Sequence, residues 1–573
     1  MTVGKLISDH IDIWSSALQT RSTAGRGGNG KIDLYGIKKL RELILELAVR
    51  GKLVPQDPND EPASELLKRI AAEKAELVKQ GKIKKQKPLP EISEDEKPFE
   101  LPEGWEWVRL GTLGYTQTGG TPSKSNAEYY GNDIPFIKPA DITAQGVIYD
   151  NEGLSIKGAE TLGRVAPSGS ILMVCIGTIG KCQVINRTCS FNQQINSITP
   201  FSDISDFIYL DVSSSYFQSL AWDYSSSTTI AILNKGKWES LLVPIAPLSE
   251  QARIVTNVKK LMSLCDQLEQ QSLTSLDAHQ QLVETLLSTL TDSPNAEELA
   301  ENWARISQHF DTLFNTEASI EALKQTILQL AVMGKLVPHF DGDTPVKETY
   351  ETICRIKEKL IKEKVYQKSS VLKPKSSKLS IPDNWLHTQF GEVCCSIVPN
   401  RDKPKSFSGN IPWITLPSFD ECNVYISEGR GEIGLSPEEI KVFNARIIPT
   451  GSVLMSCVGR FGLTMINKCE VVINQQIHAF IPLGGVVAEY LSFVIKASKK
   501  SLEESSTSTT IAYLNKSNCE SIEFGLPPLE EQKRIVDKVN ELIAMCNLVK
   551  SHMQSAQQTQ LQLADALTDA ALN

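Results

Sequence analysis

A glycine-rich segment near the N-terminus is the first place where residue types and spacing could do chemistry. Residues 25–31 read GRGGNGK and have the GxxxxGK spacing of a loop that binds nucleotide phosphates. Such a loop needs a Ser or Thr after the lysine to hold Mg²⁺, and a strand before it. Ile32 follows the lysine here, and no strand pattern precedes the segment. The segment therefore indicates a flexible linker.

Other catalytic motifs are missing from the sequence. It contains no HExxH zinc motif, no Pro-Cys nucleophile and no Asn/Asp-Pro-Pro-Tyr/Phe motif of a methyltransferase. The 12 cysteines form no CxxC pair, and the adjacent Cys394 and Cys395 have poor geometry for sharing a metal. We expect nearly all of the cysteines to be small buried hydrophobes. We predict no catalytic residue, no cofactor site and no metal site in this chain.

Composition limits where the chain can work. Hydrophobic residues make up 41% and charged residues 22%, as in ordinary globular proteins, and no apolar run approaches the ~20 residues that span a bilayer. Residues 1–20 contain Asp9 and Asp12 and match neither a signal peptide nor a transit peptide. We therefore expect a cytoplasmic chain without membrane contact, whose thiols are reduced.

The net charge of -9 is opposite in sign to that of most DNA-binding domains, which are basic because phosphate neutralisation supplies much of their affinity. By charge alone, the chain does not look like a DNA-binding protein that acts by itself.

The elements that would position any site are repeated within the chain. Several blocks occur twice in the same order, which indicates an internal duplication. The pairs are 37–55 with 320–338, 101–105 (LPEGW) with 381–385 (IPDNW), 168–180 (SGSILMVCIGTIG) with 450–462 (TGSVLMSCVGRFG), 192–195 with 474–477 (NQQI in both), 227–235 (STTIAILNK) with 508–516 (STTIAYLNK), and 247–255 (PLSEQARIV) with 528–536 (PLEEQKRIV).

The segments between these blocks diverge. Residues 116–148 and 395–427 share only an IPF/IPW core, at 134–136 and 411–413. Two domains with one scaffold and different surfaces are typical of two similar readers with different ligands.

Helical periodicity precedes each domain. Residues 37–49 place leucines on one face and end before Gly51, and residues 323–332 do the same before Gly334. A second helix is expected at 63–80. The lysine-rich stretch at 82–90 (KIKKQKPLP) is either a solvated linker or a strap that contacts phosphates, and its counterpart lies at 373–378.

Long helices follow Pro247 and Pro528, with Glu250 and Glu531 in their first turns. Apolar residues then alternate by four and three, which predicts a coiled coil of helices ~60 Å long in which each copy pairs with the other. The predicted seams are Ile254, Val258, Leu261, Cys265, Leu268, Leu282 and Leu286 in the first copy, and Ile535, Val539, Leu542, Cys546, Val549, Met553, Ala556, Leu563 and Leu567 in the second.

This layout resembles the specificity (S) subunits of Type I restriction–modification systems. The resemblance is carried by LPEGW/IPDNW, the two GSILM/GSVLM and NQQI blocks, the LNK turn, and PLSEQARIV/PLEEQKRIV before a long helix. It implies a non-catalytic subunit that reads double-stranded DNA with a bipartite site. It also implies two modification (methyltransferase) subunits and two restriction/translocase subunits as partners, which would bind S-adenosylmethionine, ATP and Mg²⁺.

The predicted fold class is accordingly α+β: two tandem target recognition domains, separated by long helices that form an antiparallel coiled coil, with an internal pseudo-two-fold duplication. The predicted domains are an N-terminal helical region and linker (1–100), target recognition domain 1 (101–247), a central helical spacer and linker (248–380), target recognition domain 2 (381–527) and a C-terminal coiled-coil helix (528–573).

Candidate DNA contacts are mostly polar and basic residues of the two recognition domains, because Arg and Lys bind guanine and phosphate, while Asn and Gln bind adenine. Asn192–Gln194 and Asn474–Gln476 are identical in both halves, which favours a structural role or shared backbone contacts over sequence reading. Thr178 and Arg460 hold equivalent places in a repeated Gly-x-x-Gly turn. The candidates are Thr118, Gly119, Gly120, Thr121, Ser123, Lys124, Lys138, Thr178 and Lys181 in the first domain, and Arg401, Lys403, Lys405, Thr415 and Arg460 in the second.

Two other functions compete with this interpretation. A coiled-coil adaptor whose two globular domains bind proteins would make no DNA contact. A fused restriction enzyme would need the catalytic motifs that the sequence lacks.

Overall fold

A computed structural model describes residues 9–21, 31–226, 230–368, 370, 372–375, 379–399, 404–420, 423–426, 433–504 and 512–572. The chain divides into two compact units, each containing one mixed α/β domain and segments of both long helices. Unit 1 comprises Met1–Thr20, Ile32–Leu273 and Gln557–Asn573, and unit 2 comprises Arg21–Lys31 and Thr274–Ala556. The repeated α+β organisation predicted from the sequence is confirmed.

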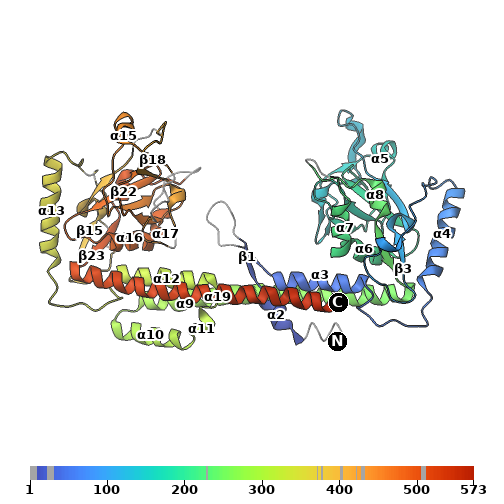
Figure 1. Cartoon of the computed structure of the whole chain (residues 1–573), viewed down its shortest axis with the longest axis horizontal. Coiled ribbons are helices and arrows are strands. Elements are labelled where there is room, and N and C mark those ends of the chain that lie inside the picture. Colours follow the sequence, from blue (N-terminus) through green and yellow to red (C-terminus); the bar gives the residue numbers. More distant parts are fainter. Residues whose placement is uncertain are drawn as a thin grey trace. The chain divides into compact units, whose positions relative to one another are not determined.

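Two four-stranded sheets form the centre of the mixed domain in unit 1 (Figure 1). The first has the order β11 (Cys182–Val184), β10 (Ile171–Val174), β13 (Ile195–Pro200), β4 (Gly114–Thr118), and its neighbouring strands are antiparallel. The second has the order β8 (Gly153–Leu154), β5 (Tyr130–Ile137), β12 (Cys189–Phe191), β9 (Val165–Ala166), in which β5 and β12 are parallel. All four residues of β10 are buried, as expected for an apolar run covered on both faces.

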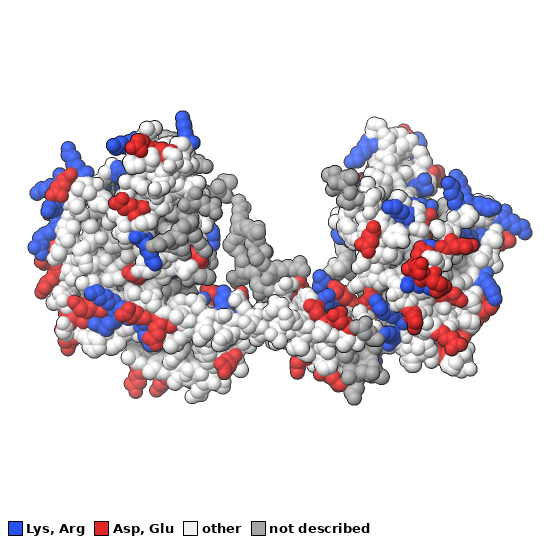
Figure 2. Space-filling model, viewed as in Figure 1, with Lys and Arg blue, Asp and Glu red and all other residues white. Residues whose placement is uncertain are grey.

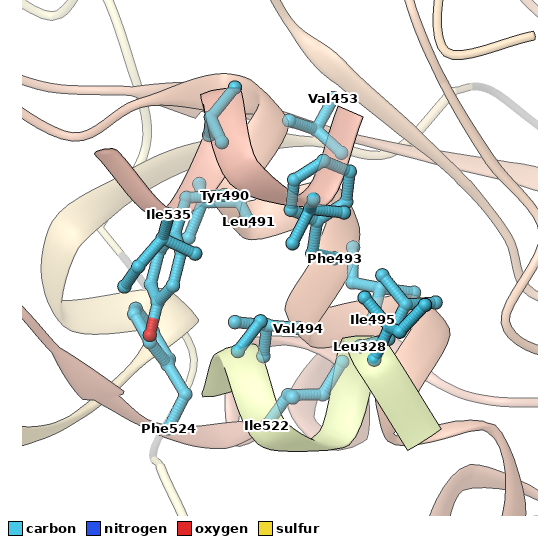
Figure 3. Packing of buried hydrophobic residues seen from close by; sticks show 14 of the residues in the cluster. Leu328, Val453, Tyr490, Leu491, Phe493, Val494, Ile495, Ile522, Phe524 and Ile535 are labelled. Atoms are coloured by element: carbon cyan, nitrogen blue, oxygen red, sulfur yellow. The ribbon is translucent and has the colours of Figure 1, made fainter. Parts of the chain in front are cut away.

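The mixed domain of unit 2 repeats this arrangement. One sheet has the order β16 (Cys394–Ile397), β22 (Ile477–Pro482), β19 (Val453–Ser456), β20 (Thr464–Ile466). The other has β18 (Gly434–Leu435), β17 (Ile411–Ile414) and β21 (Val472–Ile473), and the last two are parallel. Its core gathers around α16 (Ala488–Ala497), whose Val494 and Ile495 belong to the same buried cluster as Leu328 of α12 (Glu317–Val332) (Figure 3).

A two-stranded sheet closes each mixed domain where it meets the long helix: β3 (Glu106–Arg109) with β14 (Leu242–Ile245), and β15 (Leu386–Gln389) with β23 (Glu523–Leu526). The remaining helices of unit 1 are α2 (Ile11–Ser16), α4 (Ala63–Lys79), α5 (Ile156–Leu162), α6 (Ser205–Ser213), α7 (Ser215–Asp223) and α8 (Lys235–Ser240). Those of unit 2 are α10 (Ala296–Gln308), α11 (Phe310–Leu313), α13 (Val346–Lys362), α14 (Phe390–Val393), α15 (Pro437–Phe443), α17 (Lys499–Glu504) and α18 (Lys516–Glu520). None of the helices that the structure describes is both long and apolar enough to cross a membrane.

Helix α3 (Tyr35–Val49) fixes the direction of the long helices in unit 1. Its Arg41 pairs with Asp266 (2.7 Å) and Glu269 (2.9 Å) of α9 (Leu248–Asp292), and Gln56 beyond its end reaches Glu250. These contacts make α3 antiparallel to α9. Because the Tyr35 hydroxyl donates to Asp565 of α19 (Leu529–Leu572) and Lys52 to the carbonyl of Leu572, α3 is parallel to α19. The long helices are therefore antiparallel, as predicted.

Unit 2 repeats the packing with α12 (Glu317–Val332). Glu321 and Glu317 contact Lys550 and Gln554 of α19, which makes α12 antiparallel to α19. Its C-terminal neighbour Lys335 donates to the carbonyls of Thr291 and Ser293 at the end of α9. Each unit thus joins three helices where the sequence pattern predicted two.

The predicted seam is wrong in the second half of each long helix. Leu282 and Leu563 are 51% and 45% exposed, while the next residues, Val283 and Ala564, are buried. A helix with 3.6 residues per turn drifts by ~20° per heptad. A residue four heptads along the helix is therefore ~80° off the starting face, and its successor returns to within ~20°. The helices keep the α-helical period, and a strict heptad does not hold.

The lysine-rich stretch at 82–90 is anchored at one end. Arg109 of β3 donates to the carbonyl oxygens of Pro90 (3.3 Å) and Glu91 (2.9 Å) and pairs with Glu96. Lys84 and Lys85 are exposed. The linker and strap interpretations both stay open.

A buried tryptophan–glutamate hydrogen bond joins each mixed domain to the start of its long helix. Trp105 Nε1 donates to Glu250 Oε2 at 3.0 Å, and Trp385 Nε1 donates to Glu531 Oε1 at 2.9 Å. Both carboxylates are almost fully buried. Burial raises the pKa of Glu250, and its hydrogen bonds from Trp105 and Gln56 oppose that rise. This contact explains why the LPEGW/IPDNW and PLSEQ/PLEEQ blocks are repeated together.

The helix end before each tryptophan is shaped to the same contact. Gly51 and Gly334 adopt φ of +66° and +72°, which favours glycine, and end α3 and α12. A Cβ at Gly51 would lie 2.5 Å from the ring of Pro102, and a Cβ at Gly334 would lie 2.4 Å from the ring of Pro382. Glycine is thus required both by the backbone conformation and by the proline beside the tryptophan.

Trp105→Phe should lower the free energy of unfolding by about 1.5–3 kcal/mol, because Glu250 loses a donor while staying buried. The matched control is Trp107→Phe in the same segment, since Trp107 Nε1 is buried without a hydrogen-bond partner among the described residues. Urea unfolding of both variants checks this. Equal losses of stability would show that the indole acts by packing alone.

Asp211 on α6 is buried, and neither of its carboxylate oxygens has a hydrogen-bond partner within the described part of the chain. Burial raises its pKa well above the usual value. The unfolded chain therefore releases this proton at lower pH than the folded chain does. Stability is fully present below the unfolded pKa of ~3.9 and falls as pH rises toward the folded pKa.

Asp211→Asn removes this loss and should raise the stability of unit 1 by at least about 1 kcal/mol at pH 7, with a smaller gain at pH 5. Thermal unfolding across that range measures the difference. Asp223→Asn, at the exposed end of α7, is the control and should leave the pH profile unchanged. A pH-independent gain would contradict the titration of Asp211.

Candidate nucleic-acid interface

The NQQI block forms the same tight turn in both units. In unit 1, Asn192 Nδ2 donates to Gln194 Oε1 (3.0 Å), and the Gln194 amide donates to Asn192 Oδ1 (3.1 Å). Asn474 and Gln476 make the same two bonds at 3.1 Å in unit 2. These bonds confirm the structural role expected for this asparagine and glutamine.

The turn also holds neighbouring segments together. The Asn192 amide donates to the carbonyl of Ile137 at the end of β5, and the Cys175 amide after β10 donates to the carbonyl of Gln194. In unit 2, Asn474 and Cys457 bond to Ile414 and Gln476 in the same way. Because parallel strands end at one edge, the residues after β5 lie beside the turn that follows β12, and the residues after β17 lie beside the turn that follows β21.

Predicted residues of the first domain gather around this turn. The Gly120 amide donates to the carbonyl of Phe191, directly before the turn. Thr121 Oγ1 donates to Gln193 Oε1 at 2.6 Å, and Thr118 Oγ1 donates to Asn196 Oδ1 at 2.8 Å. Lys138 directly follows Ile137. The structure therefore brings the 118–121 loop, Lys138 and the exposed Gln193 together.

Thr178 joins this surface through the loop after β10. It is exposed between Gly177 and Gly180, and the loop follows Cys175, which bonds to the NQQI turn. Lys181 is exposed at the far end of that loop, where its carbonyl accepts from Val174. Ser123 and Lys124 are exposed further along the 118–125 loop, and the Ser123 hydroxyl contacts Ser125.

The second domain shows the equivalent places with different side chains. Thr415 follows Ile414 and begins the short 3-10 helix Leu416–Ser418, as Lys138 begins Pro139–Asp141. Arg460 is exposed in the Val458–Phe461 loop, the counterpart of Thr178. Arg401 and Lys403 lie outside the described residues.

Lys405 is exposed in a segment held by another element, the N-terminus of α15. The carboxylate of Glu439 accepts from the Ser406 hydroxyl at 2.5 Å and from the Ser408 amide. Hydrogen bonds from Ser406, Ser436 and Ser408 lower the pKa of Glu439 to about 2. Lys405 therefore lies on a segment that α15 anchors.

The surface around the candidate interface carries both positive and negative side chains. Lys138 pairs with Glu152, so its positive charge is partly neutralised. Figure 2 shows Lys and Arg interspersed with Asp and Glu on the visible face of each unit, with no unbroken basic surface there. Such a surface favours selective polar contacts over strong general attraction to phosphates.

Gln193 and Gln475, the central residues of the two turns, were not among the predicted contacts. Both are exposed at the tip of the turn while the flanking Asn and Gln side chains bond to each other. The sequence did not separate the exposed central glutamine from its hydrogen-bonded neighbours, because all residues of the block are identical in the two copies.

Comparison with known proteins identifies the family of the chain. The description Type I restriction modification DNA specificity domain matches residues 102–278 and 382–556, more than half of the chain. The chain belongs to this family. Each match covers one mixed domain and the first part of its long helix, so the family unit contains the tryptophan–glutamate contact.

Two members of this specificity family from Escherichia coli match the whole chain. The specificity subunit of the Type I restriction enzyme EcoEI is 44% identical over 607 aligned residues, and that of EcoAI is 44% identical over 601, with 100% of each chain covered in both cases. A solved chain from a study of the complex assembly and conformational transition of the type I R-M system is 18% identical with a TM-score of 0.49, covering 83% of this chain and 99% of that one. Family membership therefore rests on the sequence matches.

Gly119→Ala should destabilise unit 1 by about 1–3 kcal/mol, because the new Cβ would lie 2.1 Å from the carbonyl oxygen of Asn192. Gly120→Ala is the matched control, since its Cβ would meet only the Leu162 side chain at 3.0 Å. Thermal unfolding of the two variants measures the difference. If Gly120→Ala were the more damaging change, the close packing of the 118–121 loop on the turn would be wrong.

Proposed function

We propose that this chain is the sequence-specific DNA recognition subunit of a Type I restriction–modification enzyme. It reads a bipartite double-stranded target, one half-site per target recognition domain. One observation carries the proposal: two copies of one turn present different side chains at equivalent places, Lys138 against Thr415 and Thr178 against Arg460. The two half-sites therefore differ in sequence.

The exposed side chains suit readout of base edges. An arginine such as Arg460 binds both acceptors of guanine in the major groove, and a glutamine such as Gln193 or Gln475 binds adenine. The exposed ammonium groups of Lys124 and Lys181 suit phosphate oxygens, and contacts to phosphates fix the register of a protein on DNA.

The chain performs no chemistry in this proposal. Two modification subunits with S-adenosylmethionine and two restriction/translocase subunits with ATP and Mg²⁺ carry out methylation and cleavage. The long helices are the proposed docking elements for the modification subunits. The described cysteines are free thiols, which fits work in the reducing cytoplasm.

The negative net charge of the chain is consistent with partner subunits that supply the phosphate contacts. A chain of net charge -9 gains little from general attraction to DNA, so partner subunits supply most of the phosphate contacts. The specificity subunit then contributes the difference in affinity between sites.

The test is assembly of the full chain with its modification subunits, followed by sequencing of methylated sites. Wild type should methylate one bipartite sequence. Arg460→Ala should lower the discrimination between bases at one position of a single half-site by about 1–3 kcal/mol, roughly 5-fold to 150-fold, because one bidentate contact is lost. Replacing residues 105–247 by those of another family member should change only the other half-site.

Lys538→Ala is the control for charge, because Lys538 lies on α19 and pairs with Glu541. It should leave both half-sites unchanged. Failure of the wild-type assembly to methylate a bipartite sequence would favour the protein-binding adaptor. A change in both half-sites on exchange of one domain would contradict independent reading.

A further inference from the structure

Three metal-ligating side chains meet in the core of the second recognition domain. Cys457 follows β19, His478 lies on β22 and Cys519 lies on α18, and their ligand atoms are all within 4.8 Å of one another. All three residues are at most 4% exposed. They come from three separate segments, so the cluster has no short motif in the sequence.

The distance between the two cysteine sulfur atoms matches that of two thiolates bound to one ion. The two sulfur atoms are 3.7 Å apart. With zinc–sulfur bonds of ~2.3 Å in a tetrahedral site, two thiolates lie ~3.8 Å from each other. Sulfur and imidazole are the ligands that Zn²⁺ prefers in proteins.

An unpaired nitrogen points independently to a ligand. His478 Nε2 is buried and has no hydrogen-bond partner within the described part of the chain, although the imidazole stacks on Phe480 with ring centroids 4.5 Å apart. A buried polar atom without a partner costs about 1–3 kcal/mol, which a bond to a metal would recover. Neutral imidazole with an unprotonated Nε2 is a common zinc ligand.

The first domain lacks the ligand set at the same positions. Cys175, Asn196 and Trp238 stand where Cys457, His478 and Cys519 stand in the second copy. The buried Trp238 indole fills the space and donates to Met173 Sδ at 3.1 Å.

We propose that Cys457, His478 and Cys519 bind one Zn²⁺ ion as a structural site. Binding would deprotonate both thiols and release their protons to solvent, with the neutral imidazole as third ligand. A fourth position would remain for a water or a main-chain oxygen. The carbonyls of Met455 and Leu514 lie 3.7 Å and 3.8 Å from the sulfur atoms of Cys457 and Cys519.

The ion would brace the segments beneath the candidate interface. Cys457 leads directly into the Arg460 loop, and its amide bonds to Gln476 of the NQQI turn. Its carbonyl accepts from the Leu514 amide, which precedes α18. The position of the Arg460 loop relative to the turn would then depend on the ion. This role rests on the proposed function, whereas zinc binding itself does not.

The test measures metal in the full chain without DNA. Wild type that is purified without chelators, or freed of metal and then titrated with Zn²⁺, should hold about one zinc ion per chain, measured by inductively coupled plasma mass spectrometry. His478→Asn and Cys519→Ser should each lower this at least tenfold. Cys175→Ser, at the equivalent place in the first domain, is the matched control and should retain the zinc.

Loading wild type with Co²⁺ gives a second measurement, since cobalt–thiolate bonds absorb in the near ultraviolet. This absorption should appear at one equivalent and be displaced by Zn²⁺. If a variant does not fold, the wild-type titration alone decides. Absence of zinc and cobalt binding, unchanged zinc in His478→Asn, or a Cys457–Cys519 disulfide in place of the metal would each overturn the proposal.

Loss of half-site reading with zinc still bound would count against the proposed function alone. Zinc removal that leaves DNA reading intact would count against the bracing role alone.

Discussion

The hydrogen bond from a buried tryptophan to a buried glutamate is the constraint on which each unit depends. The glutamate lies in the first turn of the long helix, where unpaired amide groups favour a negative charge. The tryptophan lies at the first strand of the mixed domain. A carboxylate held away from water needs such a donor, so the helix cannot shift along the domain without leaving a buried charge unpaired. The contact sets where each recognition domain ends and its helix begins.

Further contacts make this junction rigid in both units. Arg253 binds Asp60 with two bonds, the shorter at 2.6 Å, and Arg534 binds Asp343 in the same way. Planar pairs of this kind fix direction as well as distance. The arginine belongs to the repeated PLSEQARIV/PLEEQKRIV block, and the aspartate belongs to the loop after α3 or α12. The junction thus ties three sequence blocks that are far apart in the chain.

The sequence predicted the fold where the physical cause is local or repeated. The duplication, the helices before each domain and the long helices follow from collinear blocks and apolar periodicity, whereas the antiparallel direction of the long helices came from the family resemblance. The slip from Leu282 to Val283 did not, because a heptad template assumes a supercoil that these helices lack. The Asp60 and Asp343 partners were also missed, since nothing in a single sequence links them to distant arginines.

Some residues of the candidate interface could likewise be predicted from the sequence, and others could not. Sequence comparison of the copies identified Thr178 and Arg460, since a changed side chain in an unchanged turn is visible without a structure. It could not separate Gln193 from its structural neighbours in an identical block. The cysteine–histidine cluster escaped because its members come from three segments, and because ligand spacing rules detect only neighbours in sequence. The prediction of no metal site in this chain is therefore one that the zinc proposal revises.

Duplication also creates a problem of pairing, and the helices carry charges that bear on it. In unit 1, Arg41 of α3 meets Glu269 of α9, whereas in unit 2 Lys550 of α19 pairs with Glu321 of α12, whose counterpart in α3 is Lys38. Lys550 is the counterpart of Glu269 in the aligned copies. If α3 packed on the start of α19, Arg41 would approach Lys550, and like charges at such a contact disfavour it. Each exposed pair contributes little to stability by itself. Its larger effect is to favour the correct helix partner when two similar surfaces compete within one chain.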